Sequence, residues 1–285
     1  MDKKDLQNPA LYTNRELSWL LFNKRVLSEA RDKQLLLFER LKFLSITASN
    51  LDEFFMVRIG SLVDMIHAEY TKKDIAGMSA KEQLDALMEE THKFAALQYS
   101  TYNRMLLPQL RANGLNFVEH HEQLTERQAQ YVDEYFEENV YPVLTPMAVD
   151  SSRPFPLIRN KTLNIGALVA KKGEKDTEIE FATVQVPSVL PRVVRIPAAK
   201  EGDTEVAVLL LEEIIERNIS KLFLNYNVLC AHPFRITRNA DLAIDEDEAE
   251  DLLLEIEKQI KKRTWGQAIR LEIEAAADRR LLKIL

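Results

Sequence analysis

The spacing of apolar residues changes once along this 285-residue chain, at Asn113-Gly114. Before that point they recur at helical intervals, as Leu17, Leu20 and Leu27 do. After it, short runs of β-branched and aromatic residues and a cluster of prolines indicate strands and loops. One period followed by another is typical of two domains rather than one uniform bundle or sandwich. We therefore predict a helical domain over 1–113 and an α+β head domain over 114–285.

Four features define the expected helices of the first domain. Thr13–Glu16 has the T-x-x-E form of a capping box. A second helix is expected through Leu37, Leu41 and Leu44, and Ser49 resembles the N-cap of a new helix. A long helix is expected from Ser79 to Arg111, with Asn113-Gly114 as its stop. We predict an antiparallel bundle of about three helices.

The second domain combines helices with strands. Helices are expected at about 125–141, 209–218 and 245–263. The charged stretch 171–178, which contains Gly173, is typical of a hairpin loop. Alternating and β-rich segments predict strands at 162–170, 179–186, 192–196, 229–237 and 268–274. The predicted fold class is α+β, with a mixed, mostly antiparallel sheet in the head domain.

Composition limits the function classes. The formal net charge is −7, whereas a protein whose whole surface binds a polyanion is usually basic, so nucleic-acid binding is not expected. Cys230 is the single cysteine, which fits a reducing compartment. The first ten residues lack the apolar core of a signal peptide, and apolar runs such as Val206–Leu211 are too short to span a bilayer. We expect a cytoplasmic protein without a transmembrane segment.

No short catalytic motif is present. The sequence lacks G-x-x-x-x-G-K-[ST], G-x-G-x-x-G, H-E-x-x-H and C-x-x-C. His120 and His121 are read as the start of a solvated loop rather than as metal ligands, because no third ligand is evident. His232 precedes Pro233 in an apolar strand and is read as a packed or hydrogen-bonded structural residue. We predict no catalytic residue and no metal site in this chain.

Two charged groups have a functional and a structural interpretation. The acidic run at 245–251 precedes basic residues at 261–263, which is what the dipole of one helix favours, so a metal cluster is the weaker interpretation. Arg153, Arg159 and Lys161 lie in a proline-rich segment and could contact phosphate, since guanidinium groups bind phosphate in a bidentate manner. A solvated surface remains the alternative for these three cations.

Asn50 is the remaining candidate binding residue. A carboxamide carries both a donor and an acceptor, so it can pair with the polar edge of adenine. From the residues alone, a capping or turn asparagine is the simpler interpretation.

Long blocks of this sequence resemble one family. NRELSWLLFNKRVLSEA and ERLKFLSITASNLDEFFMVRIGSL are similar to the opening of the long-chain bacterial polyphosphate kinases. TPMAVDSSRPFPLIRNKTLNIGALV, VLLLEEIIERNISKLF and AHPFRITRNADLAIDEDEAEDLL resemble the head domain of that family, in the same order. The resemblance runs from about residue 11 to 275. It implies reversible transfer of the ATP γ-phosphate to polyphosphate, through a phosphohistidine and with magnesium.

The resemblance also implies roles for parts of the chain. In the family, the asparagine of the S-N-L-D-E-F block belongs to the ATP site, and here that residue is Asn50. The head domain contacts a second subunit, so homo-oligomer contacts are expected. The phosphorylated histidine and the magnesium-binding arginines belong to two carboxy-terminal domains, which this chain does not contain; none of its histidines matches the nucleophile. We expect no turnover by this chain alone.

A different class of function also fits the sequence. The chain could be a stand-alone module that binds polyphosphate, a nucleotide or a protein without catalysis. The net charge of −7 argues against tight polyphosphate binding, because the grip on phosphates is largely electrostatic.

Overall fold

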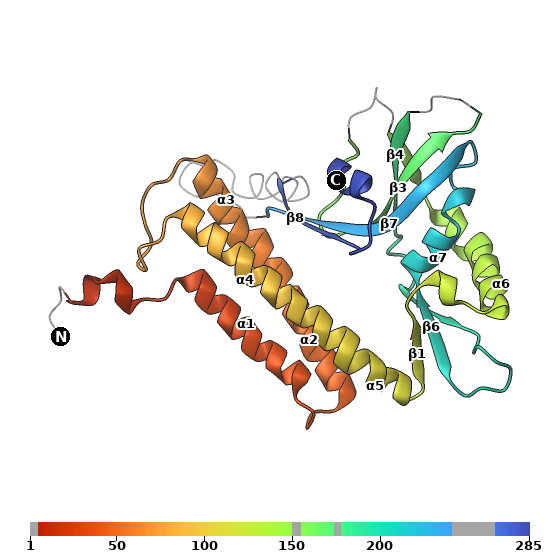
Figure 1. Ribbon diagram of the computed structural model, residues 1–285, viewed down its shortest axis with the longest axis horizontal. Helices are drawn as coiled ribbons and strands as arrows, with labels where there is room; N and C mark the ends of the chain where they lie inside the picture. The colour runs from red at the N-terminus through yellow and green to blue at the C-terminus, as the bar shows by residue number, and fades with distance from the viewer. Residues whose placement is uncertain (1–4, 150–154, 174–177, 241–265) are drawn as a thin grey trace, which may run out of the picture. The chain divides into compact units, whose positions relative to one another are not determined.

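A computed structural model describes residues 5–149, 155–173, 178–240 and 266–285 (Figure 1). The chain forms two compact units. The first contains Met1–Leu110 and Thr237–Arg270, and the second contains Arg111–Ile236 and Leu271–Leu285. Helices dominate the first unit and sheets the second, which confirms the predicted α+β class.

The first unit is a helical bundle. Its helices are α1 (Arg15–Arg31), α2 (Leu37–Glu53), α3 (Gly60–His67) and α4 (Ala80–Thr101), and α5 (Leu107–Ala112) extends past its end. Wider π-helical turns, Phe54–Ile59 and Tyr102–Leu106, join α2 to α3 and α4 to α5. Helix α1 packs against α2 and α4, and α3 packs against α4. Side chains from all four helices form one apolar core that includes Leu27, Leu51, Leu62 and Leu87.

Two of the expected helix starts are wrong. Asn14, not Thr13, is the N-cap of α1, and its side-chain oxygen accepts from the amides of Glu16 and Leu17. Ser49 caps no helix, because α2 continues through it to Glu53. The expected start at Ser79 is confirmed, with the reciprocal capping box to Glu82.

The segment after Ile236 returns to the first unit. The amide of Ala240 donates to the carbonyl of Met56 at 2.9 Å, and the Asn239 carboxamide donates to Asp64 at 2.8 Å. Ile269 packs against the helical core. These contacts join the segment to α3 and to the π-helical turn before it. The predicted division into 1–113 and 114–285 stays a prediction.

The described residues form two sheets. The smaller has the strand order β1-β6-β5, in which β1 (Leu115–Val118) runs parallel to β6 (Val206–Leu210) and β5 (Val193–Ile196) runs antiparallel to it. The larger has the order β2-β4-β3-β7-β8, and its β2/β4, β4/β3 and β3/β7 pairs are antiparallel. Its strands are β2 (Pro146–Val149), β3 (Leu163–Lys171), β4 (Ile179–Gln185), β7 (Tyr226–Arg238) and β8 (Ala268–Ile273).

The central strand β3 is covered on both faces. Ile165 and Val169 join a core that includes side chains of α6 (Glu126–Tyr135) and α7 (Leu211–Arg217). Leu168 joins a second core with Phe234 and Leu281, the latter from α9 (Arg279–Ile284). Because both faces of β3 are buried, its sequence is a nearly continuous apolar run.

The expected strands are found within a few residues of their predicted bounds. Three strands were not expected, namely β1, β2 and β6. The helix expected from residue 209 begins at Leu211, because residues 206–210 pair with β1 and β5. Strands β3 and β4 pair antiparallel, as the expected hairpin requires, and Gly173 has a φ of +90°. Residues 174–177 of the expected loop lie outside the described residues. The helix expected at 245–263 lies outside the described residues.

Candidate functional site

Asn50 lies in the last turns of α2, on the helix rather than at its start. Its backbone carbonyl accepts from the amide of Phe54, where the helix widens into the π-helical turn. Asn50 is half-buried. The interpretation of Asn50 as a residue beside an N-cap is therefore wrong, whereas its role at an ATP site stays a prediction.

One hydrogen bond ties the Asn50 carboxamide to α1. Its Nδ2 donates to Oδ1 of Asn23 at 3.1 Å. The Asn23 side chain is completely buried, and its own Nδ2 donates to the backbone carbonyl of Thr47 at 3.1 Å. The Thr47 hydroxyl accepts in turn from Nε2 of Gln98, on α4, at 2.9 Å. A continuous polar network therefore crosses three helices inside an apolar bundle.

Sequence reasoning missed Asn23. A signal was present, because Asn23 stands between Leu20 and Leu27 at helical spacing and shares their buried face. A polar residue in a buried stripe needs a hydrogen-bond partner, since an unsatisfied buried amide costs roughly 1–3 kcal/mol. That partner belongs to another helix and could not be identified from α1 alone.

Aromatic and charged contacts hold the chain around the end of α2. Phe54 stacks on Trp19 with ring centroids 4.3 Å apart. Arg270 lies over the Phe55 ring, 4.8 Å from its centroid, and approaches Asp52 at 3.5 Å. The end of α2, which carries Asn50, is thus held by contacts with α1 and with the returning segment that contains Arg270.

The candidate phosphate contacts lie in the second unit. Arg159 and Lys161 are exposed in the segment that leads into β3. The backbone of Lys161 has a positive φ of 61°, and its amide donates to the carbonyl of Ile236 at 2.8 Å. Arg153 lies outside the described residues. A phosphate contact by any of these three residues stays a prediction.

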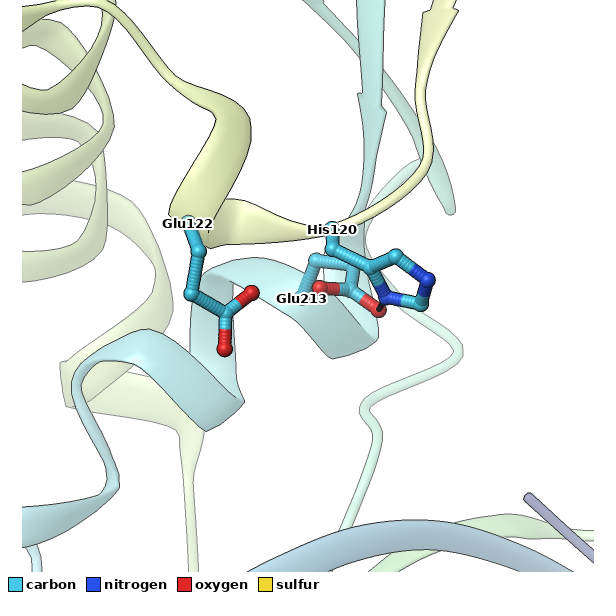
Figure 2. Close-up of side chains that lie close together, drawn as sticks. All are labelled: His120, Glu122 and Glu213. Atoms are coloured by element: carbon cyan, nitrogen blue, oxygen red, sulfur yellow. Dashed lines mark ion pairs between the residues drawn. The ribbon is translucent and has the colours of Figure 1, made fainter. Parts of the chain in front are cut away.

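A second group of polar side chains lies beside α7. Figure 2 shows His120 and Glu122, from the short turn after β1, close to Glu213 on α7. The backbone amide of His121 donates to Oε2 of Glu213 at 2.9 Å, and its Nδ1 lies 3.2 Å from the same atom. His120 Nδ1 is 3.9 Å from the other carboxylate oxygen. His121 thus faces Glu213 and is half-buried, which corrects its interpretation as the start of a solvated loop.

This group continues to the edge of the larger sheet. Nδ1 of His232 lies 2.9 Å from Glu274, so His232 is hydrogen-bonded as expected, and its structural role stays a prediction. Glu216 lies within 4.8 Å of both, measured between their possible ligand atoms. Burial, and then the nearby carboxylates of Glu213, Glu274 and Glu122, raise the pKa of Glu216 to about 8. Burial also raises the pKa of Glu213, against the hydrogen bonds from His121.

Histidine and carboxylate side chains are the ligand types that zinc prefers, and three overlapping triads bring such atoms together. However, Glu213 and Glu274 already have histidine partners, and a protonated Glu216 carries no charge that needs a cation. Hydrogen bonding therefore accounts for the cluster, and the absence of a metal site stays a prediction. The acidic run at 245–251 lies outside the described residues.

Two family descriptions match this chain. The sequence model for the polyphosphate kinase N-terminal domain matches residues 12–118, and that for the polyphosphate kinase middle domain matches residues 127–285.

Among the helices that the structure describes, none is long and apolar enough to cross a membrane.

Curated relatives and a solved structure agree with these matches. A polyphosphate kinase of Halalkalibacterium halodurans is 48% identical over 283 residues, which are 99% of this chain and 39% of that protein. One of Synechocystis is 42% identical over 97% of this chain and 38% of that protein. The crystal structure of polyphosphate kinase from Porphyromonas gingivalis matches 95% of this chain and 36% of its own, with a TM-score of 0.75 and 27% identity.

The chain thus spans less than two fifths of these relatives. Both domain matches fall in the order in which the helical and sheet-containing regions follow each other along the sequence. On this evidence, the chain belongs to the polyphosphate kinase family and corresponds to its N-terminal and middle domains.

Proposed function

We propose that this chain is the nucleotide-covering and assembly portion of a cytoplasmic polyphosphate kinase. The complete enzyme would transfer the γ-phosphate of ATP reversibly to polyphosphate, with magnesium, and would use ADP in the reverse direction. Within this portion Asn50 would contact adenine, and the head domain would contact a second subunit.

The observation that carries this proposal is the similarity over 99% of the chain to a protein named polyphosphate kinase. The carboxamide of the half-buried Asn50 supports the adenine contact, because it offers both an acceptor and a donor. Arg153, Arg159 and Lys161 remain secondary candidates for phosphate contacts, since arginine and lysine suit that ligand.

The chain alone should not transfer phosphate. Phosphoryl transfer depends on charge positioned around the transferred group, and the resemblance assigns the nucleophile and the magnesium-binding groups to other domains. We expect no growth of polyphosphate when the chain is incubated with ATP, magnesium and a polyphosphate primer. Growth that follows the chain through purification would contradict this expectation.

The adenine contact is tested in a kinase that carries the remaining domains. Replacing Asn50 by Ala should weaken ATP use by roughly 1–3 kcal/mol in kcat/KM, because a partly buried hydrogen bond is lost. Ser49→Ala is the matched control, since Ser49 is exposed on the same helix. An unchanged ATP dependence of Asn50→Ala would leave Asn50 as a structural residue only.

A stand-alone binding module predicts a different result. Such a module would bind polyphosphate, nucleotide or protein tightly without the other domains. Calorimetry with polyphosphate at low salt separates the two: tight binding that falls steeply with salt favours the module. The net charge of −7 leads us to expect weak binding.

A further inference from the structure

The hydrogen bonds around Asn23 fix which way its carboxamide points. The carbonyl of Thr47 can only accept, so the group that Asn23 turns toward it must be Nδ2. Oδ1 of Asn23 therefore faces Asn50 and can only accept as well. This leaves Asn50 one way to bond to Asn23, which is through Nδ2.

The same hydrogen bond determines which polar groups of Asn50 remain available for a ligand. One N–H of its Nδ2 is used by Asn23, and Oδ1 makes no hydrogen bond to any residue in the described part of the chain. The groups left for a ligand are therefore an acceptor, Oδ1, and the second N–H of Nδ2. A free asparagine could exchange these two positions by turning its amide through half a revolution. Here that turn would bring Oδ1 of Asn50 against Oδ1 of Asn23, two acceptors facing each other.

Adenine and guanine differ at the atoms that such an amide reads. Adenine has an amino donor at position 6 next to a ring-nitrogen acceptor, which matches Oδ1 and the N–H of Asn50. Guanine has a carbonyl acceptor at position 6, which needs the amide turned the other way or meets Oδ1 as a second acceptor. An amide held in one orientation can thus distinguish two bases that a freely turning amide would accept.

We propose that Asn23 is a positioning residue that holds the Asn50 carboxamide in one orientation and thereby selects adenine over guanine nucleotides. The inference rests on the proposed function of Asn50. Because Asn23 is completely buried, it would act through Asn50 rather than by contact with the nucleotide.

The test replaces Asn23 by Leu, which has a similar volume and no polar atoms. Thr91→Val is the matched control, because Thr91 is a buried polar residue of the same bundle whose hydroxyl, among the described residues, bonds only to Met88 of its own helix. In a kinase that carries the remaining domains, kcat/KM is measured for ATP and for GTP. We expect Asn23→Leu to reduce the ATP-over-GTP ratio roughly tenfold, mainly through KM, and Thr91→Val to leave the ratio unchanged.

A second measurement uses the 285-residue chain and does not depend on that variant folding. The side-chain amide signals of Asn50, assigned by their loss in Asn50→Ala, are followed by NMR during titration with magnesium-ATP or magnesium-GTP. We expect them to shift with ATP at lower nucleotide concentration than with GTP. GTP that acts at Asn50 as readily as ATP would overturn the proposal.

The measurements distinguish a failure of the Asn23 positioning role from a failure of the Asn50 adenine contact. If Asn50→Ala weakens ATP use but Asn23→Leu keeps the ATP-over-GTP ratio of a folded enzyme, the positioning role of Asn23 is wrong and the adenine contact stands. If Asn50 neither shifts with ATP nor affects its use, the adenine contact fails and the positioning role fails with it.

Discussion

The guanidinium of Arg270 lies 3.5 Å from a carboxylate oxygen of Asp52, although 218 residues separate them in the sequence. Their side chains are only 15% and 8% exposed, so both charges are largely removed from water. The same guanidinium covers the ring of Phe55. This contact joins the start of β8 to the end of α2, close to Asn50.

Replacing Arg270 by Met should therefore destabilise the helical unit by about 3 kcal/mol. The change leaves the buried Asp52 carboxylate without this cation, and a charge stripped of its buried partner is costly. Urea unfolding followed by circular dichroism measures the effect. Arg104→Met, at an exposed arginine of the same unit, should change the free energy of unfolding by less than about 0.5 kcal/mol.

A double variant tests whether the two charges are coupled. Asp52→Asn combined with Arg270→Met should be less destabilised than the sum of the single variants, because the interaction between the two charges is lost only once. Simple additivity would mean that the ion pair contributes little.

Gly60 allows the returning segment to approach α3 closely. A Cβ atom at this position would lie 2.3 Å from Oδ1 of Asn239, whose amide group is held by Asp64. We expect Gly60→Ala to cost roughly 1–3 kcal/mol, as overpacking does, and to speed hydrogen exchange of the Ala240 amide that bonds to Met56. The amide of Lys161, in the other unit, is the internal reference. Unchanged exchange at Ala240 would show that Asn239 moves aside without loosening the segment.

Structural features that depend only on neighbouring residues could be predicted from the sequence. The helix starts predicted at Ser79 and Thr125 are confirmed, and each carries a capping box, S/T-x-x-E/Q, that depends only on residues within one turn. The turn at Gly173 forms for the same reason, since only glycine adopts its φ without strain. Thr13 is not the cap because α1 begins one residue later than predicted, where the Asn14 side chain accepts from the first amides of the helix.

Features that depend on distant partners were missed. Strand β1 has four residues and pairs with β6, and Leu115 lies opposite Val206. Neither strand is long enough to be recognised without the other, and residues 209–210 also fit a helical pattern. The Asn23–Asn50 contact joins two helices, so the orientation of both amides could not be derived from either segment. For Asn50, the family resemblance supplied a role that its local sequence does not.

Glu216 should make stability depend on pH. Its folded pKa of about 8 lies above the ordinary value of 4.5, so folding binds a proton that the unfolded chain releases. The stability associated with this proton is present below pH 4.5 and is lost as the pH rises through 8. We expect Glu216→Gln to be more stable than the unmodified chain at pH 9, by on the order of 2 kcal/mol after allowing for partial exposure to water.

The comparison at low pH provides the control for this prediction. Near pH 4 the two proteins should be nearly equally stable, because Glu216 is then protonated in both states. Glu201→Gln, at an exposed glutamate, should show no such divergence. An equal gain at pH 4 and pH 9 would attribute the effect to packing rather than to titration.

The Gln128 side chain makes two separate contacts, one in the cap of α6 and one beside the smaller sheet. Its Oε1 accepts from the Thr125 amide at 3.1 Å, while its Nε2 donates to the carbonyl of Pro197 at 2.9 Å, and the residue is 2% exposed. Gln128→Glu keeps the acceptor for the cap but turns a carboxylate oxygen toward the Pro197 carbonyl. The loss should be roughly 2–3 kcal/mol at pH 8 and smaller at pH 4, where a protonated Glu can donate again. Thr125→Ala, which removes only the cap, should cost about 1 kcal/mol at both pH values in urea unfolding. If the loss of stability for Gln128→Glu is also independent of pH, the Pro197 contact contributes nothing to stability.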